Sequence, residues 1–268
     1  MAKMLFFSAG SPPLQLYQEA MRSMIQTEAC KLGVANPDAY FTAGHDYVLA
    51  VQGGELLSLC VIKRNTLPHA TYLGYSLAIT KPEARRSRLV ARMLVLYLLR
   101  ALPRLLWSAL KGPGHKLFVY GDIGSPLLYA KTCQLKTPIY PNLIRGDTPE
   151  QRERGAKLRE DIIAHCNIRN MWQRPGVERR IDCSTGLIQD HGEAAAKQPI
   201  PPRGEEFSLD RHWHTRWQDY VPANSDLLVI VPLTPLLVLR QLDDFIKFGF
   251  RRPNLAKPSQ LRLVQDQA

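Results

Sequence analysis

The segment Tyr72-Leu-Gly-Tyr-Ser-Leu-Ala-Ile79 leads at once into Thr80-Lys-Pro-Glu-Ala-Arg-Arg-Ser-Arg88, and Leu89-Val-Ala-Arg-Met-Leu-Val-Leu-Tyr-Leu-Leu99 follows. The first part is an apolar run that predicts a strand, the second is a basic turn, and the third predicts a helix. A helix N-terminus presents unpaired N–H groups, and its dipole favours negative charge. A strand that delivers four cations and a helix start to one place therefore predicts an anion site that suits a phosphorylated cofactor.

The arginines of this turn, Arg85, Arg86 and Arg88, also have a simpler interpretation as a solvated helix start without a ligand. Cations at that end of a helix oppose its dipole, at a cost of about 0.3–1 kcal/mol. Three of them at one helix start are better explained by a bound anion, and we favour that interpretation.

Composition limits the class of protein. The chain has 268 residues, 45% of them apolar, which suffices for a sizeable core and is too apolar for a disordered chain. Its net charge of +11 favours anionic partners, namely nucleotides, nucleic acid or an acidic membrane surface, without choosing among them. The five cysteines form no C-x-x-C pair, which favours reduced thiols and a cytoplasmic location over a disulfide framework or a zinc ribbon.

Neither a signal peptide nor a transmembrane segment is expected from the sequence. The N-terminal apolar run is shorter than a signal h-region. The longest apolar stretch, 89–110, carries three arginines and is interrupted by Pro103.

The flanking segments before residue 72 predict a strand, a helix and a hairpin. Residues 5–9 form the short strand, and 14–32 carry apolar positions at helical spacing. Residues 47–51 and 56–62 are apolar runs joined by a turn with Gly53-Gly54, which supplies the positive φ angles of a tight hairpin turn.

The segments after residue 88 continue the alternation. We expect a central helix over 88–102, a buried strand over 116–122, a short helix over 127–134 and a strand over 135–140.

The remaining half changes in composition. A charged helix is expected over 149–166, capped by Asp147, and 167–225 are expected to be mostly irregular. A strand at 226–234 and an amphipathic helix at 235–250 follow, and the last residues form a loose tail.

Residues 167–225 contain a basic and aromatic group: Trp172, Arg174, Arg179, Arg180, Trp213 and Trp217. Such a composition can bind single-stranded nucleic acid, cover an apolar cleft, or simply pack, and we favour cover or packing. His212 and His214 could share a strand face and hold a metal, but no third ligand is near in sequence, so no metal site is expected.

Three places resemble the GNAT acyltransferase superfamily, over roughly residues 5–140. The hairpin Val48–Val61 resembles the second and third strands of the family. Leu77–Ala91 resembles its fourth strand and acyl-CoA pyrophosphate loop. Leu117–Lys131 is similar to its fifth strand and following helix, which often carries Leu-Tyr-x-Lys.

The resemblance implies an α/β (α+β) fold with a mixed, mostly antiparallel central sheet flanked by helices. Residues 1–140 would form the acyl-CoA-binding core, and 141–225 a partly irregular insertion or cover. Residues 226–252 would supply a late strand and helix that complete the core, with 227–232 pairing with 135–140, and 253–268 would be the tail. A separate small C-terminal domain is the alternative.

The resemblance also implies the site residues. Backbone groups of Leu77, Ala78 and Ile79 would meet the pantetheine arm, and Tyr129 would protonate the departing CoA thiolate. The pyrophosphate would be held by amides of the turn and helix start: Arg85, Arg86, Ser87, Arg88, Leu89 and Val90.

The turn departs from the family pattern, because Arg88 and Val90 stand where small residues are usual. A side chain at either position could hinder backbone approach to phosphate, or the loop binds with arginine side chains replacing some amide contacts.

The implied activity is acyl transfer from acyl-CoA or acetyl-CoA, without a metal, to an unknown amine or hydroxyl acceptor. The alternative is a degenerate GNAT-like fold that binds nucleic acid or another anionic partner without catalysis.

Overall fold

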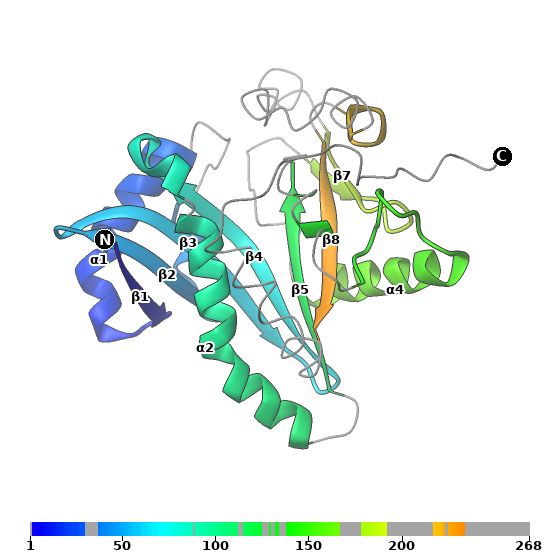
Figure 1. Ribbon diagram of the computed structural model, residues 1–268, viewed down its shortest axis with the longest axis horizontal. Helices are drawn as coiled ribbons and strands as arrows, with labels where there is room; N and C mark the ends of the chain where they lie inside the picture. The colour runs from blue at the N-terminus through cyan, green and yellow to red at the C-terminus, as the bar shows by residue number, and fades with distance from the viewer. Residues whose placement is uncertain are drawn as a thin grey trace. The chain divides into compact units, whose positions relative to one another are not determined.

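The computed structural model describes residues 2–29, 37–87, 89–111, 115–124, 129, 132–133, 138–166, 178–191, 217–222 and 225–233 (Figure 1). The chain divides into two compact units, and each is described by itself. The first contains 1–119, 170–175 and 233–252, and the second contains 120–169, 176–232 and 253–268.

Four antiparallel strands in chain order build the first unit: β1 (Lys3–Ser8), β2 (His45–Gln52), β3 (Glu55–Thr66) and β4 (Ala70–Thr80). The predicted hairpin is confirmed, with Gly53 and Gly54 at φ 60° and 85° in the β2–β3 turn. These glycines adopt a backbone conformation that other residues rarely take, so the turn is encoded locally.

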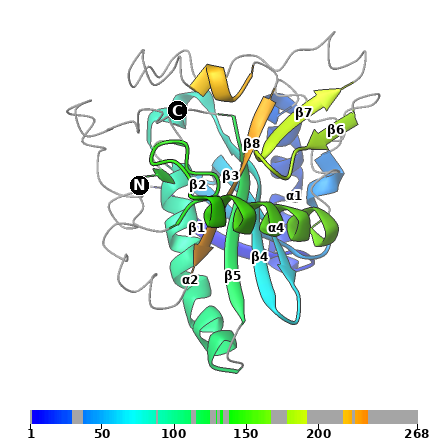
Figure 2. The same ribbon diagram turned by 90° about the vertical axis from the view of Figure 1, so that its right-hand side faces the viewer.

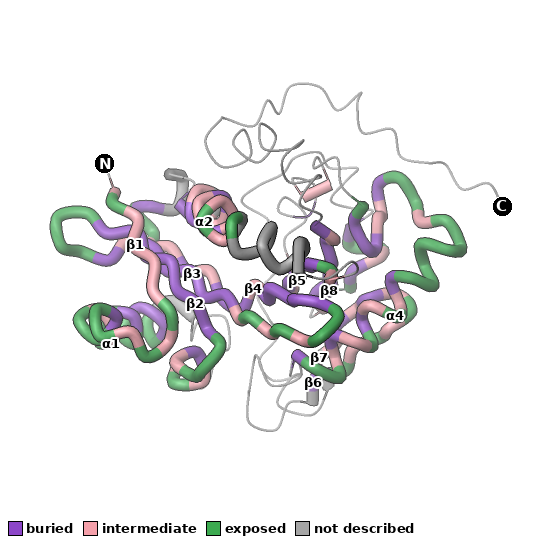
Figure 3. Tube along the Cα trace, turned by 90° about the horizontal axis from the view of Figure 1, so that it is seen from below, coloured by how far each residue is buried: buried purple, intermediate pink, exposed green. Residues whose placement is uncertain are grey.

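Two helices cover the two faces of these strands. Figure 3 shows the buried strands β2 and β3 between α1 (Pro12–Met24) and α2 (Leu89–Lys111). The core on the α1 face consists mainly of aliphatic side chains: Leu14, Met21, Met24, Ile25, Leu49, Val51, Leu56, Leu59, Val61, Leu77 and Ile79. The α1 segment ends in a π-helical turn, Ile25–Ala29, and the rest of the predicted helix, from residue 30, lies outside the described residues.

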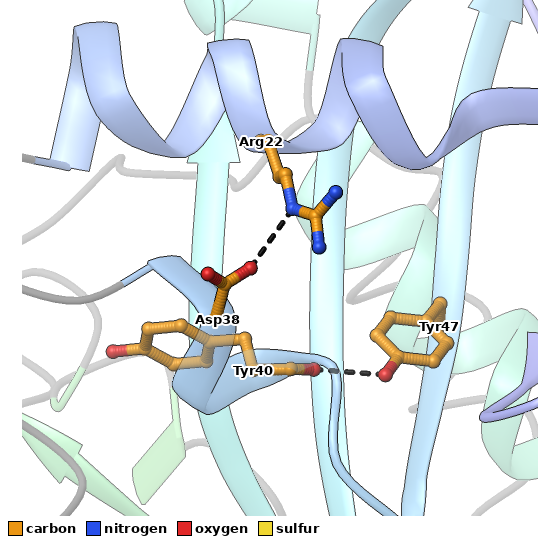
Figure 4. A network of polar contacts seen from close by, with 4 residues as sticks. All are labelled: Arg22, Asp38, Tyr40 and Tyr47. Atoms are coloured by element: carbon orange, nitrogen blue, oxygen red, sulfur yellow. Dashed lines mark hydrogen bonds and ion pairs between the residues drawn. The ribbon is translucent and has the colours of Figure 1, made fainter. Parts of the chain in front are cut away.

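Polar contacts tie the loop before β2 to this face (Figure 4). Nε of Arg22 on α1 donates to Asp38 Oδ1 at 2.9 Å, within the short 3-10 turn Pro37–Tyr40. The hydroxyl of Tyr47 on β2 donates to the Tyr40 carbonyl at 2.8 Å.

The sequence predicts a helix that ends at residue 102, before Pro103, but α2 continues through this proline to Lys111. A proline inside a helix removes one hydrogen bond and costs about 3 kcal/mol. Helix α2 packs against β2, β3 and β4, and such tertiary contacts supply most of the stability of helices in proteins.

Strand β5 (Lys116–Ile123) has residues in both units, and it follows β4 in the strand order. In the second unit, β8 (Ser225–Leu233) is followed by β7 (Leu187–His191) and β6 (Glu178–Ile181), and Figure 2 shows the β6–β7 hairpin beside β8. The predicted strands 116–122 and 226–234 are thereby confirmed. Tyr140 forms an antiparallel bridge with Ile230, which confirms the predicted pairing of 135–140 with the late strand at that residue.

Two sequence predictions in this unit were wrong. Helix α4 (Pro149–His165) is capped by Thr148 instead of Asp147, because Thr148 and Gln151 form a reciprocal capping box. Residues 178–191 form the β6–β7 hairpin instead of an irregular segment.

The β6–β7 turn is held by a distant residue, which explains why its sequence carries little strand pattern. Arg159 on α4 is 1% exposed. Its Nε and Nη2 donate to the carbonyls of Cys183 and Ser184 at 2.6 and 2.8 Å. These bonds join residues far apart in the chain, so they leave no alternation of apolar residues by which the strands could be recognised in the sequence.

The predicted fold class is confirmed, since the structure is mixed α/β with a mostly antiparallel set of strands accompanied by helices. Of the predicted helix 127–134, the described residues Tyr129, Thr132 and Cys133 are helical. The predicted helix 235–250 and the tail lie outside the described residues. Within the part of the chain that is described, no helix is long and apolar enough to cross a membrane.

Candidate functional site

The predicted anion site begins where β4 ends. Lys81 follows the strand, a 3-10 turn spans Pro82–Ser87, and α2 starts at Leu89. The first backbone N–H groups of a helix have no intrahelical partner, and its dipole adds positive potential there. The structure therefore places a helix N-terminus within a few residues of the strand end, as the sequence predicts.

The structure describes the basic turn by its backbone, from Arg85 to Ser87. The backbone of Arg85, Arg86 and Ser87 belongs to the 3-10 turn, but their side chains, and the whole of Arg88, lie outside the described atoms. Leu89 is buried and Val90 is partly buried at the start of α2. The cofactor-binding role of these residues stays a prediction.

The three residues predicted to meet a pantetheine arm, Leu77, Ala78 and Ile79, differ in the edge of β4 that their peptide groups face. The Lys81 N–H donates to the Leu57 carbonyl of β3 at 3.0 Å, so the peptide groups of Lys81 face β3. Since peptide groups alternate between the two edges of a strand, those of Ile79 also face β3 and those of Ala78 face the opposite edge. Ser58 Oγ on β3 donates to the Ile79 carbonyl at 2.8 Å, in agreement.

A β-bulge lies just before these residues. Ile62 is opposite Tyr75 and Val61 is opposite Leu77, so Ser76 has no counterpart on β3. Bulges bend a strand, leave a residue out of the ladder and are frequent beside active sites. The sequence contains only one weak signal of this bulge, a serine within an apolar strand.

A cavity of about 670 Å³ lies beside the turn, on the side of the β2–β3 hairpin. Glu55 and Glu83 line it together with Arg92. Glu55 also forms an ion pair with Lys81. The two carboxylates are balanced by Lys81 and Arg92, so this cavity carries no excess positive charge for a phosphate, and the backbone amides of the turn are the better place for a phosphorylated ligand.

Tyr129, the predicted proton donor, is completely buried in the second unit. Its hydroxyl donates to the Pro141 carbonyl at 2.8 Å and accepts from the Leu143 N–H at 2.7 Å. Its ring packs against Trp217, with centroids 5.2 Å apart. Burial raises the pKa of the hydroxyl, which keeps it protonated, and the proton is engaged by a backbone carbonyl.

Buried charges occur in the second unit at residues that the sequence did not connect. Arg179 Nη1 lies 2.7 Å from Asp122 Oδ2, and its Nη2 lies 3.5 Å from Asp226 Oδ2. All three side chains are almost completely buried. Arg179 is therefore a core residue, as the packing interpretation predicts, and is not displayed for nucleic acid.

Of the remaining candidates, Arg180 is exposed on β6, and the others lie outside the described residues: Trp172, Arg174, His212, Trp213 and His214. Among the described side chains, no group of three His, Cys, Asp or Glu residues could hold a metal ion. Burial raises the pKa of the Cys60 thiol on β3, so this cysteine is not an activated nucleophile.

Comparison with known proteins gives similarity in structure only. No family model and no curated protein sequence matches the chain. An acyl-CoA N-acyltransferase structure from Pseudomonas aeruginosa aligns with TM-score 0.36 and 16% identity, covering 53% of this chain and 93% of that one. The ribosomal-protein-S18-alanine N-acetyltransferase from Escherichia coli aligns with TM-score 0.36 and 11% identity, covering 55% and 86%.

An aminoglycoside 6′-N-acetyltransferase complexed with coenzyme A aligns with TM-score 0.32 and 13% identity. The alignment covers 45% of this chain and 61% of that one, less than two thirds of its length. By their names these proteins are one N-acyltransferase and two N-acetyltransferases. At TM-scores below 0.5 such similarity does not define an activity, so the function has to be inferred from the residues of this chain.

Proposed function

We propose that this protein transfers an acyl group from acyl-CoA directly to an amine or hydroxyl acceptor. The observation that carries the proposal is the junction of β4 with α2. There a bulged strand, whose peptide groups alternate between the edge shared with β3 and the edge next to β5, leads through one short turn into a helix N-terminus. An extended amide-containing arm that ends in a pyrophosphate matches these two features in that order.

The roles divide between the strand and the turn. In the segment Leu77–Ile79, Ala78 is the residue whose peptide groups face away from β3, so it is the best placed to pair with the pantetheine arm. The amides of residues 85–90 would hold the pyrophosphate, assisted by the arginine side chains. No metal is needed, because donors and helix dipole supply the positive potential.

Tyr129 is our candidate for protonating the departing thiolate. A hydroxyl with a raised pKa is present as the acid form, which a proton donor requires. It would have to exchange its bond to the Pro141 carbonyl for one to the sulfur. The proposal includes a cytoplasmic location, in keeping with reduced cysteines.

Ligand-dependent stability tests the proposal. Acetyl-CoA and palmitoyl-CoA are titrated while thermal unfolding of the full chain is followed, with tripolyphosphate as an anionic control. An acyl-CoA at 100 times its dissociation constant should stabilise the protein by about 2.7 kcal/mol. Replacing Ala78 by proline removes one backbone N–H and should weaken acyl-CoA binding, whereas any effect of tripolyphosphate, which lacks the arm, should be the same on both forms.

The alternative makes the opposite prediction. A degenerate fold that binds nucleic acid would show no stabilisation by either acyl-CoA, and its affinity for DNA or RNA would fall steeply with salt. That combination of results would overturn the acyltransferase proposal.

A further inference from the structure

A second cavity, of about 640 Å³, lies in the first unit on the face of the strands that α2 covers. Strands β1, β2, β3 and β4 contribute to its lining, together with the middle of α2. Its volume falls within the range of about 300–1,000 Å³ that is typical of small-molecule sites.

This cavity is separate from the β4–α2 junction. It contains Thr71 at the first end of β4, whereas Ala78 lies about 23 Å further along at about 3.3 Å per residue. It contains Arg100 of α2, which lies about 16 Å along the helix from Leu89 at about 1.5 Å per residue. A ligand at one site therefore leaves the other accessible.

The floor of the cavity is built around a buried carboxylate. Asp46 on β2 accepts Ser8 Oγ at 2.7 Å on Oδ1 and the Tyr97 hydroxyl at 2.8 Å on Oδ2. Arg64 Nη1 on β3 lies 3.6 Å from the same Oδ2. Both carboxylate oxygens of Asp46 therefore already accept a hydrogen bond, and the carboxylate orients the Arg64 guanidinium and is not a site for a cationic ligand.

The cavity carries more positive than negative charge. Arg64 is 39% exposed at its side chain, and its one charged contact among the described residues is the long one to Asp46. Arg100 contacts no carboxylate among the described side chains, and its guanidinium lies 5.1 Å from the centroid of the Phe6 ring. One carboxylate therefore faces two guanidinium groups, which leaves about one positive charge for a ligand to neutralise.

The apolar part of the lining limits the ligand further. The rings of Phe6 and Tyr97 and the side chain of Leu73 contribute surface that a bare inorganic anion would not use. A guanidinium over an aromatic ring keeps N–H donors available for contact with an oxyanion.

We infer that this cavity binds a small organic oxyanion, a carboxylate or phosphate ester attached to a flat apolar group, with Arg64 and Arg100 on the anion and Phe6 and Leu73 against the apolar part. Binding here is independent of acyl-CoA. It supplies the chain with a second ligand site, for an acidic substrate or effector.

The test uses phenyl phosphate and benzoate as probes and benzyl alcohol as the uncharged control, on the full chain by calorimetric titration. At least one of the two anions should bind, and benzyl alcohol should bind at least tenfold more weakly. Arg100→Gln changes an exposed side chain and should weaken anion binding at least tenfold.

Arg22→Gln is the matched control. Arg22 is also exposed and lies over an aromatic ring, 5.3 Å from the Phe41 centroid, but on the α1 face beside Asp38 (Figure 4). This variant should bind the probe like the unchanged protein. Equal losses in Arg22→Gln and Arg100→Gln would reduce the binding to general attraction by the net charge of +11 and overturn the inference.

Two further outcomes are decisive. No binding of either anion at 10 mM would overturn the inference (about 2.7 kcal/mol is the binding free energy at that dissociation constant). Saturating acetyl-CoA should leave probe affinity unchanged, and competition between them would show that the cavity is not a separate site. If acetyl-CoA does not bind at all while the probe does, the proposed function fails and the second site stands.

Discussion

Replacing Tyr129 by phenylalanine separates a structural role from a catalytic one. The substitution removes one buried oxygen that accepts the Leu143 N–H at 2.7 Å and donates to the Pro141 carbonyl at 2.8 Å. A buried group left without its partner costs about 1–3 kcal/mol. The bond to Leu143 is only partly buried, so water can replace it in part, and we expect a loss of about 2–4 kcal/mol in the free energy of unfolding.

The matched control is Tyr220→Phe in the same unit. The Tyr220 hydroxyl makes one long hydrogen bond, of 3.3 Å to the Thr185 carbonyl, and its removal should cost less than about 1 kcal/mol. Urea unfolding of both variants, followed by circular dichroism and tryptophan fluorescence, gives the two free energies. Equal stability of Tyr129→Phe and the unchanged protein would refute the structural reasoning.

The same variant is then assayed for acyl transfer under conditions in which it is folded. A general acid contributes about 10²–10⁴-fold to turnover, so kcat should fall by at least 100-fold while acyl-CoA affinity changes little. Unchanged kcat in a destabilised protein would leave Tyr129 as a packing and turn-holding residue.

Three further changes test the packing and the pH dependence. Gly186→Ala should lower the free energy of unfolding in urea by about 2–3 kcal/mol, because φ is +85° and the new Cβ would lie 3.2 Å from the Leu228 carbonyl oxygen. Gly146→Ala is the control: its φ is +75° but the space around it is open, so only the cost of the left-handed backbone conformation remains, about 1–2 kcal/mol. Thr148→Ala should cost about 1 kcal/mol through loss of the capping box, and Ser11→Ala, at a helix start without a side-chain bond, should change little; equal effects would contradict the capping assignment. Burial lowers the pKa of His45 below its ordinary 6.5, so the unfolded chain takes up a proton first and stability should decline as the pH falls below about 6.5; thermal unfolding of His45→Gln should lack this decline.

Local signals account for the elements that could be predicted. The glycine pair at Gly53 and Gly54 specifies the β2–β3 hairpin by backbone conformation alone, and the apolar runs before and after the basic turn specify β4 and α2. The helix start at residue 149 was expected, yet its cap was placed one residue early, since Asp147 and Thr148 are both good capping residues and only the bond to Gln151 distinguishes them.

The parts that could not be predicted depend on distant partners. Strands β6 and β7 contain charged residues without strand alternation, and they form because Arg159 holds their turn and β8 supplies their ladder. Asp46 and Arg64 are ordinary strand-end residues in the sequence, and they define a cavity only because α2 brings Tyr97 and Arg100 to the same face.

The sequence by itself therefore determined the order of strands and helices in the first unit and the place of the predicted anion site, because a strand, a basic turn and a helix that follow one another need no distant partner to lie together. The tertiary structure alone decided which peptide groups of β4 face away from β3, where Ser76 leaves the ladder and which charges share a cavity. Those features depend on strand register and on helix placement, which arise from contacts between residues far apart in the chain.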